Sequence, residues 1–412
     1  MNVSSYTNWN LVKYSLATGS LILVNYLLWS INLWQIFKYI NFIFLIAVIL
    51  NFYISKKFNE YWYLKIIILF LFLISLGSPN FSIDSRYIYL FSAKIFFYDS
   101  NIYSFINNHL SEIITTRPKL AATLSATFAQ LIGFWNEVFP KSTNIIVIFP
   151  PIIFLVSFFK NRIFIILWLF LMLFFSGKLF INGSLDGIIS LYFVSCILIS
   201  YKLLSVRKIG EQNTLYSLLF LFFSILSLTK NEGPVMVLII TFTSILTNFL
   251  YYKKINFKFI FITLISLVPF FMWKYIVFTN SLDFTIIQYD TGNPINRFMD
   301  RISNSDDLLL ILSYLVENNK LILSAIFFIL VSYKFFTNNK KLIFFISINF
   351  LLYFLALIFA FLIDPFELTY KLQASSTRVF IPLVLMLSYF SIFIIKNKYF
   401  LEQNKTHTDS LI

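Results

Sequence analysis

The sequence predicts an all-α polytopic membrane protein with about twelve transmembrane helices. Its 412 residues are 59% hydrophobic and only 12% charged, which is far from the balance of a soluble domain. Apolar runs recur from near the N-terminus to Tyr399, many of them about 20 residues long, the length a helix needs to cross a bilayer core. We therefore expect a single transmembrane domain over 1–398 and a polar cytoplasmic tail over 399–412.

The apolar runs give the approximate position of each span. The first run lacks a charged leader and a small-residue cleavage site, so we expect it to be retained as a span. The predicted spans are roughly 14–34, 36–54, 61–78, 143–159, 163–181, 187–205, 214–229, 233–250, 258–278, 320–336, 342–362 and 379–396.

The charges predict which side of the membrane each connection occupies. With the N-terminus in the cytoplasm, the inner turns are short and basic, as the positive-inside rule expects: Lys56–Lys57, Lys160 with Arg162, Arg207–Lys208, Lys253–Lys254, Lys340–Lys341 and Lys396 with Lys398. The whole net charge of +14 then falls on the inner side, whereas most carboxylates fall outside. The charge is a topology signal that requires no nucleic acid, and carboxylate chemistry is expected at the exoplasmic face.

Three outer connections are long, at about 79–142, 279–319 and 363–378, and loops of this length are usually functional. In the first, Tyr87–Phe97 and Leu120–Val138 have helix-like apolar spacing. This pattern predicts amphipathic helices on the membrane surface, or alternatively helices that simply cap the bundle. The single cysteine excludes an intrachain disulfide, and no Cys/His metal spacing is present.

The first candidate site residue is Asp84, just beyond the outer end of the third span. A carboxylate there can act as a general base on an acceptor hydroxyl, or it can cap the helix that begins near Arg86. Arg86 and Lys94 can pair with Asp84 or bind an anionic group. Further along this loop, Arg117 and Glu137 say little on their own.

Three more candidates lie at two other outer turns. Asp186, in NGSLDGIIS, opens the sixth span, where it can also serve as an N-cap. Lys230 and Glu232, in LTKNEGPV, form a turn between two apolar runs. Ionisable groups at membrane depth are costly and indicate function, so Lys230 is expected to meet a lipid phosphate while Glu232 orients it or an acceptor.

Arg378 opens the last span and Lys371 precedes it by two helical turns. Arginine suits a phosphate because its planar fork makes paired, charge-assisted bonds. The alternative is an interfacial anchor whose charged end reaches the lipid headgroups. Outer carboxylates can also hold a divalent cation such as Mg²⁺ or Mn²⁺, although no spacing specifies a metal site.

Six segments, taken in order, resemble the GT-C superfamily of polytopic glycosyltransferases, in particular the bacterial aminoarabinose-lipid and galacturonosyl transferases and the protein O-mannosyltransferases. RPKLAATLSATFAQLIGFWNE is similar to the group's YP-x-L … G-x-x-N-E helix, NGSLDGIISLYF to its G-x-x-D turn and SLTKNEGPVMVLI to its T-K-x-E-G turn. The others are SIDSRYIYLFSAKIFF, SLVPFFMWKYIV and SSTRVFIPLVL, and the likeness covers roughly residues 80–385.

The resemblance implies a GT-C-like fold in the bacterial plasma membrane with its active site on the exoplasmic side. It implies inverting transfer of a sugar from a polyprenyl-phosphate carrier to a lipid, glycan or protein acceptor. Asp84 matches the superfamily's catalytic base, and Lys230, Glu232 and Arg378 match positions near the carrier phosphate and the acceptor. The chain departs from the group where Arg117 replaces a usual tyrosine. It also lacks the second acidic residue that some members carry beside the base.

Two other functions remain open. A transporter or flippase of lipid-linked oligosaccharide suits twelve spans, but transporters usually place broken helices and charges near the membrane midplane and often show paired halves. A polymerase of lipid-linked oligosaccharide also works at the outer face, and we expect it to use an arginine-rich outer loop. The outer loops here are as acidic as they are basic.

Overall fold

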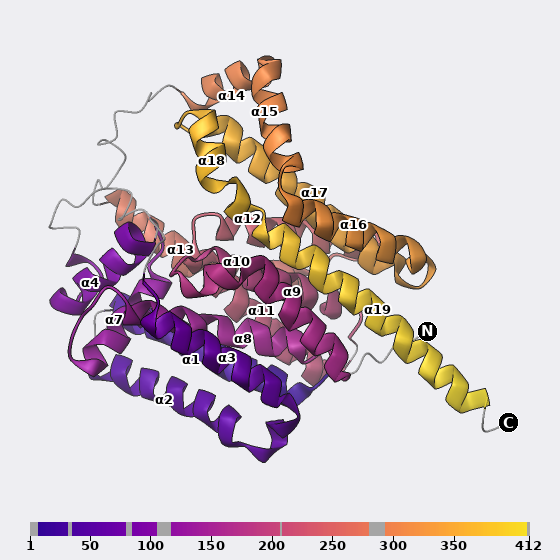
Figure 1. The fold of residues 1–412 in the computed structure, drawn as a ribbon, viewed down its shortest axis with the longest axis horizontal. Coiled ribbons are helices and arrows are strands. Elements are labelled where there is room, and N and C mark those ends of the chain that lie inside the picture. Colours follow the sequence, from indigo (N-terminus) through magenta and orange to yellow (C-terminus); the bar gives the residue numbers. More distant parts are fainter. Residues whose placement is uncertain are drawn as a thin grey trace.

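The computed structural model describes residues 7–31, 35–79, 85–104, 117–206, 208–279 and 293–409, which form helices and no strand (Figure 1). Within these ranges, eleven helices are long and apolar enough to cross a membrane. The remaining predicted span, the tenth at 320–336, passes the same test only as a pair of helices, Ser305–Val316 and Asn319–Lys334, which are bent by 70° relative to each other. The polytopic, all-α prediction is therefore confirmed, with one broken or re-entrant segment.

The N-terminal two thirds of the chain supply most of the bundle. Its long helices are α1 (Trp9–Ile31), α2 (Gln35–Ile54), α3 (Trp62–Gly77), α8 (Thr143–Val156), α9 (Arg162–Ile181), α10 (Asp186–Leu203), α11 (Ile209–Thr229), α12 (Gly233–Tyr252) and α13 (Phe257–Thr279). Short 3-10 helices, Lys56–Tyr61 and Phe139–Ser142, lead into α3 and α8. Because successive helices run in opposite directions, their connecting turns fall alternately at the two ends of the bundle.

Helices α8 and α10 form the centre of the bundle. The α8 segment is buried along its whole length and α10 almost so. The adjacent prolines Pro150 and Pro151 lie inside α8, where each removes a backbone donor. The Val147 carbonyl, which would accept from residue 151, instead accepts from the Tyr192 hydroxyl at 3.0 Å. A neighbouring helix therefore satisfies the freed backbone group, as burial away from water requires.

The outer helices turn large apolar side chains away from the protein. On α9, Ile163, Phe170 and Phe174 are 61–69% exposed, and on α13, Phe261 and Leu264 are similarly exposed. An exposed apolar belt of this extent is unstable in water and is what a lipid-facing surface requires.

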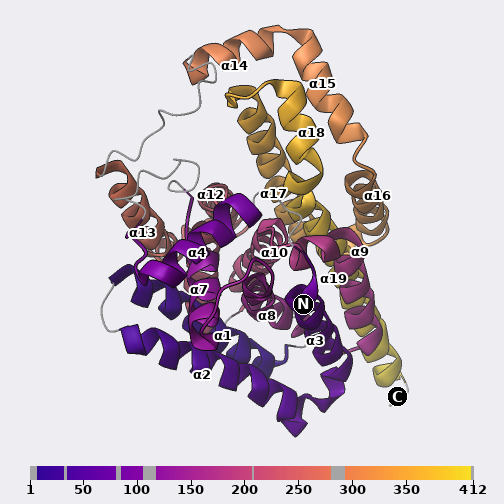
Figure 2. The ribbon, with the colours of Figure 1, turned by 60° about the vertical axis from the view of Figure 1, so that its left-hand side comes forward.

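The C-terminal part adds α14 (Pro294–Ser303), α15 (Ser305–Val316), α16 (Asn319–Lys334), α17 (Phe336–Ile363), α18 (Leu368–Val379) and α19 (Ile381–Asp409). Helices α14, α15 and α18 stand beyond one end of the bundle (Figure 2). The long outer connections predicted at 279–319 and 363–378 are therefore largely helical where they are described. Helix α19 also continues into the predicted tail as far as Asp409.

The first long loop contains two helices in its described part, α4 (Leu90–Asp99), which follows a π-helical turn at Ser85–Tyr89, and α7 (Leu120–Ile132). Helix α7 ends earlier than the predicted Val138 because Gly133 adopts a left-handed conformation, with φ of 90°. Most of its residues are buried against the bundle. Their placement on a membrane surface stays a prediction.

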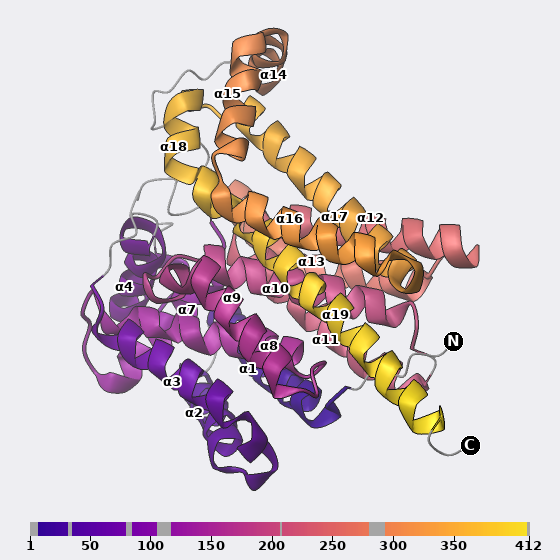
Figure 3. The same ribbon diagram turned by 45° about the vertical axis from the view of Figure 1, so that its right-hand side comes forward.

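The two ends of the bundle carry different elements (Figure 3). At one end, α1 begins next to the end of α8, where the Asn8 amide donates to the Ser157 carbonyl at 2.8 Å. The basic turns before α9 and α13 and the later part of α19 lie at this end. The opposite end carries α4, α14, α15 and α18, together with the charged residues described next.

Candidate active site

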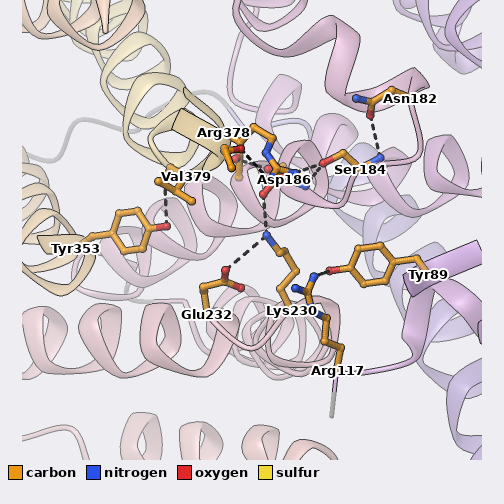
Figure 4. Close-up of polar contacts among 12 residues, drawn as sticks. Tyr89, Arg117, Asn182, Ser184, Asp186, Lys230, Glu232, Tyr353, Arg378 and Val379 are labelled. Carbon is orange, nitrogen blue, oxygen red and sulfur yellow. Dashed lines mark hydrogen bonds and ion pairs between the residues drawn. The ribbon is translucent and has the colours of Figure 1, made fainter. Parts of the chain in front are cut away.

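Asp186, Lys230 and Arg378 point toward one another at the end of the bundle opposite the basic turns (Figure 4). They come from the start of α10, the α11–α12 turn and the end of α18. Here Lys230 Nζ lies 2.7 Å from Asp186 Oδ1, and the two side chains are only 10% and 6% exposed. Arg378 Nη1 lies 3.7 Å from Asp186 Oδ2, and the Ser184 hydroxyl donates to the same oxygen. Asp186 is therefore the centre of a nearly buried charge cluster.

A tight turn before α10 positions Asp186. The Asn182 carboxamide accepts from the Ser184 amide at 2.9 Å, and the intervening Gly183 has φ of 81°. A Cβ on Gly183 would lie 2.0 Å from the Ser85 hydroxyl, so only glycine fits. The alternative interpretation of Asp186 as an N-cap is wrong, because it is the first helical residue and its carboxylate is engaged with Lys230.

A second tight turn positions Lys230. The Gly233 amide donates to the Lys230 carbonyl at 3.0 Å, and Pro234 occupies the first turn of α12. A Cβ on Gly233 would lie 2.0 Å from the Leu226 carbonyl oxygen, so α11 and α12 can approach this closely only because residue 233 is glycine. The turn directs the ammonium group of Lys230 toward α10.

Two carboxylates keep Lys230 charged. Burial lowers the pKa of this amine, but the charges of Asp186 and Glu232 outweigh burial and raise the pKa above its ordinary value. The Glu232 contact is longer, at 3.5 Å, and the Glu232 side chain is 45% exposed. The Asp186 carboxylate is thus fully engaged by its neighbours in the cluster, whereas part of the Glu232 side chain stays accessible to solvent.

The cluster forms one wall of a cavity of about 270 Å³. Six residues predicted from the sequence line it, namely Arg117, Asp186, Lys230, Glu232, Lys371 and Arg378. Four of these are cations and two are carboxylates, so the cavity is electropositive and suits an anion such as a phosphate. They come from distant parts of the chain and are brought together only by the fold.

Neighbouring side chains orient two of the cations. Arg117 Nη1 donates to the Tyr89 hydroxyl at 3.4 Å, and Lys371 Nζ lies 2.7 Å from Asp364 Oδ2. Tyr89, Phe366 and Tyr370 contribute aromatic surface to the cavity. An aromatic wall beside cations provides both an apolar face for a sugar ring and charge for its phosphate.

Three predicted residues do not join this cavity, and a fourth is not described. Lys94 and Glu137 pair with each other at 3.1 Å and are exposed by 41% and 46%. Arg86 is exposed, with its guanidinium 5.9 Å from the Tyr87 ring centroid. The predicted base, Asp84, lies outside the described residues.

Sequence reasoning missed the aromatic residues Tyr89, Phe366 and Tyr370. A signal exists for Tyr370, because Tyr370, Ala374 and Arg378 follow one another at helical spacing of four residues. The segment is too polar for a span and is predicted as a loop, which hides this periodicity. Tyr89 has no comparable signal, since it reaches the cavity from a π-helical turn.

Within the described ranges, no cluster of three or more His, Cys, Asp or Glu side chains has the arrangement of a metal site. The structure therefore assigns no described residues to the divalent cation considered from the sequence. No known protein family, curated protein or solved structure matches this chain.

Proposed function

We propose that this chain is a membrane glycosyltransferase that moves a sugar from a polyprenyl-phosphate carrier to a lipid, glycan or protein acceptor at the exoplasmic face. The observation that carries the proposal is the electropositive cavity at one end of a lipid-facing helix bundle. A lipid-linked phosphate can reach such a site from the bilayer while its charged group occupies the cavity.

The proposed reaction uses the cavity cations on the leaving group. The acceptor hydroxyl oxygen attacks the anomeric carbon of the sugar, and the bond from that carbon to the carrier phosphate oxygen breaks with inversion. The electron pair of the broken bond stays on the phosphate, where Arg117, Lys230 and Arg378 stabilise the developing charge. Lys230 and Arg378 are fixed in place beforehand by their contacts with Asp186, and Arg117 by its hydrogen bond to Tyr89.

The hydroxyl proton passes to a carboxylate. Asp84 is the proposed base, on the strength of the resemblance. Asp186 is unsuitable because Lys230, Ser184 and Arg378 all contact its oxygens. Glu232 lines the cavity with an accessible side chain, and we assign it the orientation of the acceptor.

A flippase or transporter of the same lipid is the main alternative. Alternating access uses a site near the bilayer midplane between two moving halves. The cavity here lies at helix ends, beside turns that are held by buried ion pairs and by glycines that leave no room for side chains. This placement favours chemistry at one face.

Binding of the carrier can be tested with a defined probe. Polyprenyl phosphate should slow the reaction of a thiol reagent with Cys196, the only cysteine and a fully buried one, whereas polyprenol without phosphate should not. Arg378→Gln should weaken the phosphate effect at least tenfold, and the exposed Lys94→Gln should leave it unchanged. Equal protection by polyprenol, or an unaffected Arg378→Gln variant, would contradict the site.

Turnover separates the transferase from the flippase. In vesicles loaded with polyprenyl-phosphate sugars, a transferase releases free polyprenyl phosphate when acceptor is supplied on the outer side. Movement of the intact lipid across the bilayer without release would instead establish transport.

A further inference from the structure

A second cavity lies at the opposite, basic end of the bundle. It is a groove of about 490 Å³ between α1, α11 and α13. Its walls are apolar, formed by Leu16 from α1, Phe220 and Leu221 from α11, and Ile262 and Ile265 from α13. Neighbouring α13 side chains such as Phe261 and Leu264 face outward and are more than 60% exposed, so the groove opens on the lipid-facing surface.

The end of the groove nearest the basic turns is polar and ordered by its own contacts. Lys258 Nζ donates to Asn213 Oδ1 at 3.1 Å and lies 4.4 Å from the centroid of the Tyr216 ring. The Asn256 carboxamide donates to the Tyr216 hydroxyl at 2.7 Å. The Lys258 ammonium group is therefore held at the mouth of the groove. The Tyr216 ring beside it is itself held by the hydrogen bond from Asn256.

The groove is long enough for a lipid headgroup and the first part of an acyl chain. From Lys258 to Ile265 is seven residues of α13, or about 10 Å along the helix axis. The polar mouth thus lies at the level of the helix ends, and the apolar walls extend inward by about a third of a bilayer core.

The charge around the mouth is positive. Lys253 and Lys254 form the turn before α13, and Lys13 lies one turn of α1 before Leu16, toward the same end. The acidic neighbour on α11, Glu211, lies 3.6 Å from Lys208 in an ion pair. A phosphate carrying a net negative charge is favoured at such a mouth over a zwitterionic headgroup.

We propose that this groove binds an anionic phospholipid of the cytoplasmic leaflet. Its phosphate contacts Lys258, and the first part of an acyl chain lies between α1, α11 and α13. The site is separate from the electropositive cavity at the other end, and the proposal does not depend on the transferase function.

Native mass spectrometry of the full-length protein tests this proposal. Protein extracted from vesicles of equal phosphatidylglycerol and phosphatidylcholine should retain phosphatidylglycerol preferentially. Lys258→Gln should reduce that preference about fivefold, the effect of about one surface lysine on an anionic lipid. Ser217→Trp places an indole in the groove without changing charge, and it should reduce retention to a similar extent.

Lys340→Gln is the matched control, because Lys340 is also an exposed lysine near an aromatic ring, 5.6 Å from the Phe336 centroid, but does not line the groove. It should leave the preference unchanged. Equal retention of the two lipids by wild type would overturn the proposal. So would an unchanged Lys258→Gln variant, an equal loss in Lys340→Gln, or full retention by a folded Ser217→Trp variant, since the last two results indicate diffuse surface attraction.

Discussion

Breaking the ion pair between Asp186 and Lys230 by removing one partner should cost more stability than breaking an exposed pair such as Lys94–Glu137. Asp186→Asn keeps the side-chain volume but leaves the Lys230 charge in a site where its side chain is only 10% exposed. Removing one partner of a buried pair typically costs about 3–5 kcal/mol. Because Glu232 remains 3.5 Å from the ammonium, we expect a value near the lower end, about 3 kcal/mol.

Cys196 provides the assay for this cost. It is the only cysteine, it is fully buried, and it lies ten residues along α10 from Asp186, about 15 Å away. A thiol reagent reaches it only through opening of the structure, so its reaction rate reports the opening equilibrium. A loss of ~3 kcal/mol raises that equilibrium about a hundredfold. Asp186→Asn and Lys230→Met should each show that increase in purified protein.

The double variant is decisive. With both charges removed, the ions left without these partners, Arg378 and Glu232, are 30% and 45% exposed and reach solvent. The reaction rate of the double variant should therefore be far below the product of the two single effects. Glu137→Gln is the control, because its pair with Lys94 is also close, at 3.1 Å, but exposed, and should change the rate about fivefold or less. Singles that react at the wild-type rate, or a double variant equal to their product, would refute the reasoning.

Three further predictions concern the groups that support the cavity. Gly233→Ala should raise the Cys196 reaction rate by at least tenfold, since its Cβ meets the α11 backbone, whereas Gly210→Ala, with open space around it, should not. Tyr89→Phe should lower sugar transfer about tenfold by removing a hydrogen bond to a guanidinium, with unchanged reactivity of the buried thiol. Burial is the main cause, and two neighbouring cations the lesser one, of a Lys119 pKa well below its ordinary value. At alkaline pH the unfolded chain therefore binds more protons than the folded protein, so stability rises with pH. Unfolding midpoints in a denaturing detergent should therefore rise from pH 7 toward pH 10, and that rise should be smaller in Lys119→Met than in wild type.

The contribution of Lys230 to stability depends on pH in the opposite direction from that of Lys119. Its pKa in the folded protein is raised, so its stabilising effect is fully present below the ordinary lysine pKa of about 10.4 and is lost only as pH rises through the higher folded value. The cost of Asp186→Asn should therefore be constant between pH 6 and pH 9. The two lysines can be distinguished by this contrast alone.

The spans are predictable because the bilayer imposes one length and one composition on every crossing helix. The 70° bend between α15 and α16 is not, because each helix is apolar by itself and the break at Glu317–Asn318 depends on packing. Likewise the sequence of α18, LTYKLQASSTRV, is too polar for a span and predicts a connection. Its place over the cavity comes from tertiary structure.

The charged cavity residues are identifiable because a lysine or a carboxylate between apolar runs is costly and is kept mainly where it has a function. The partners that these residues contact cannot be identified from the sequence. Nothing in NGSLDG indicates that Asp186 contacts Lys230, 44 residues later, and the sequence makes Lys94 as promising as Lys371, although only Lys371 lines the cavity. Types of residue follow from the sequence, whereas distances between them require the fold.

The central claim is sugar transfer from a polyprenyl-phosphate carrier, and the direct measurement is made in host cells that lack their own copy of this chain. Mass spectrometry would compare lipid-linked sugars and envelope glycans in cells carrying wild type, Asp84→Asn, Arg378→Gln or the control Lys94→Gln, at equal protein levels. The predicted result is that one sugar disappears from one acceptor in the first two variants while its lipid-linked donor accumulates, and that the control matches wild type. Unchanged glycans in Asp84→Asn and Arg378→Gln cells would contradict the claim.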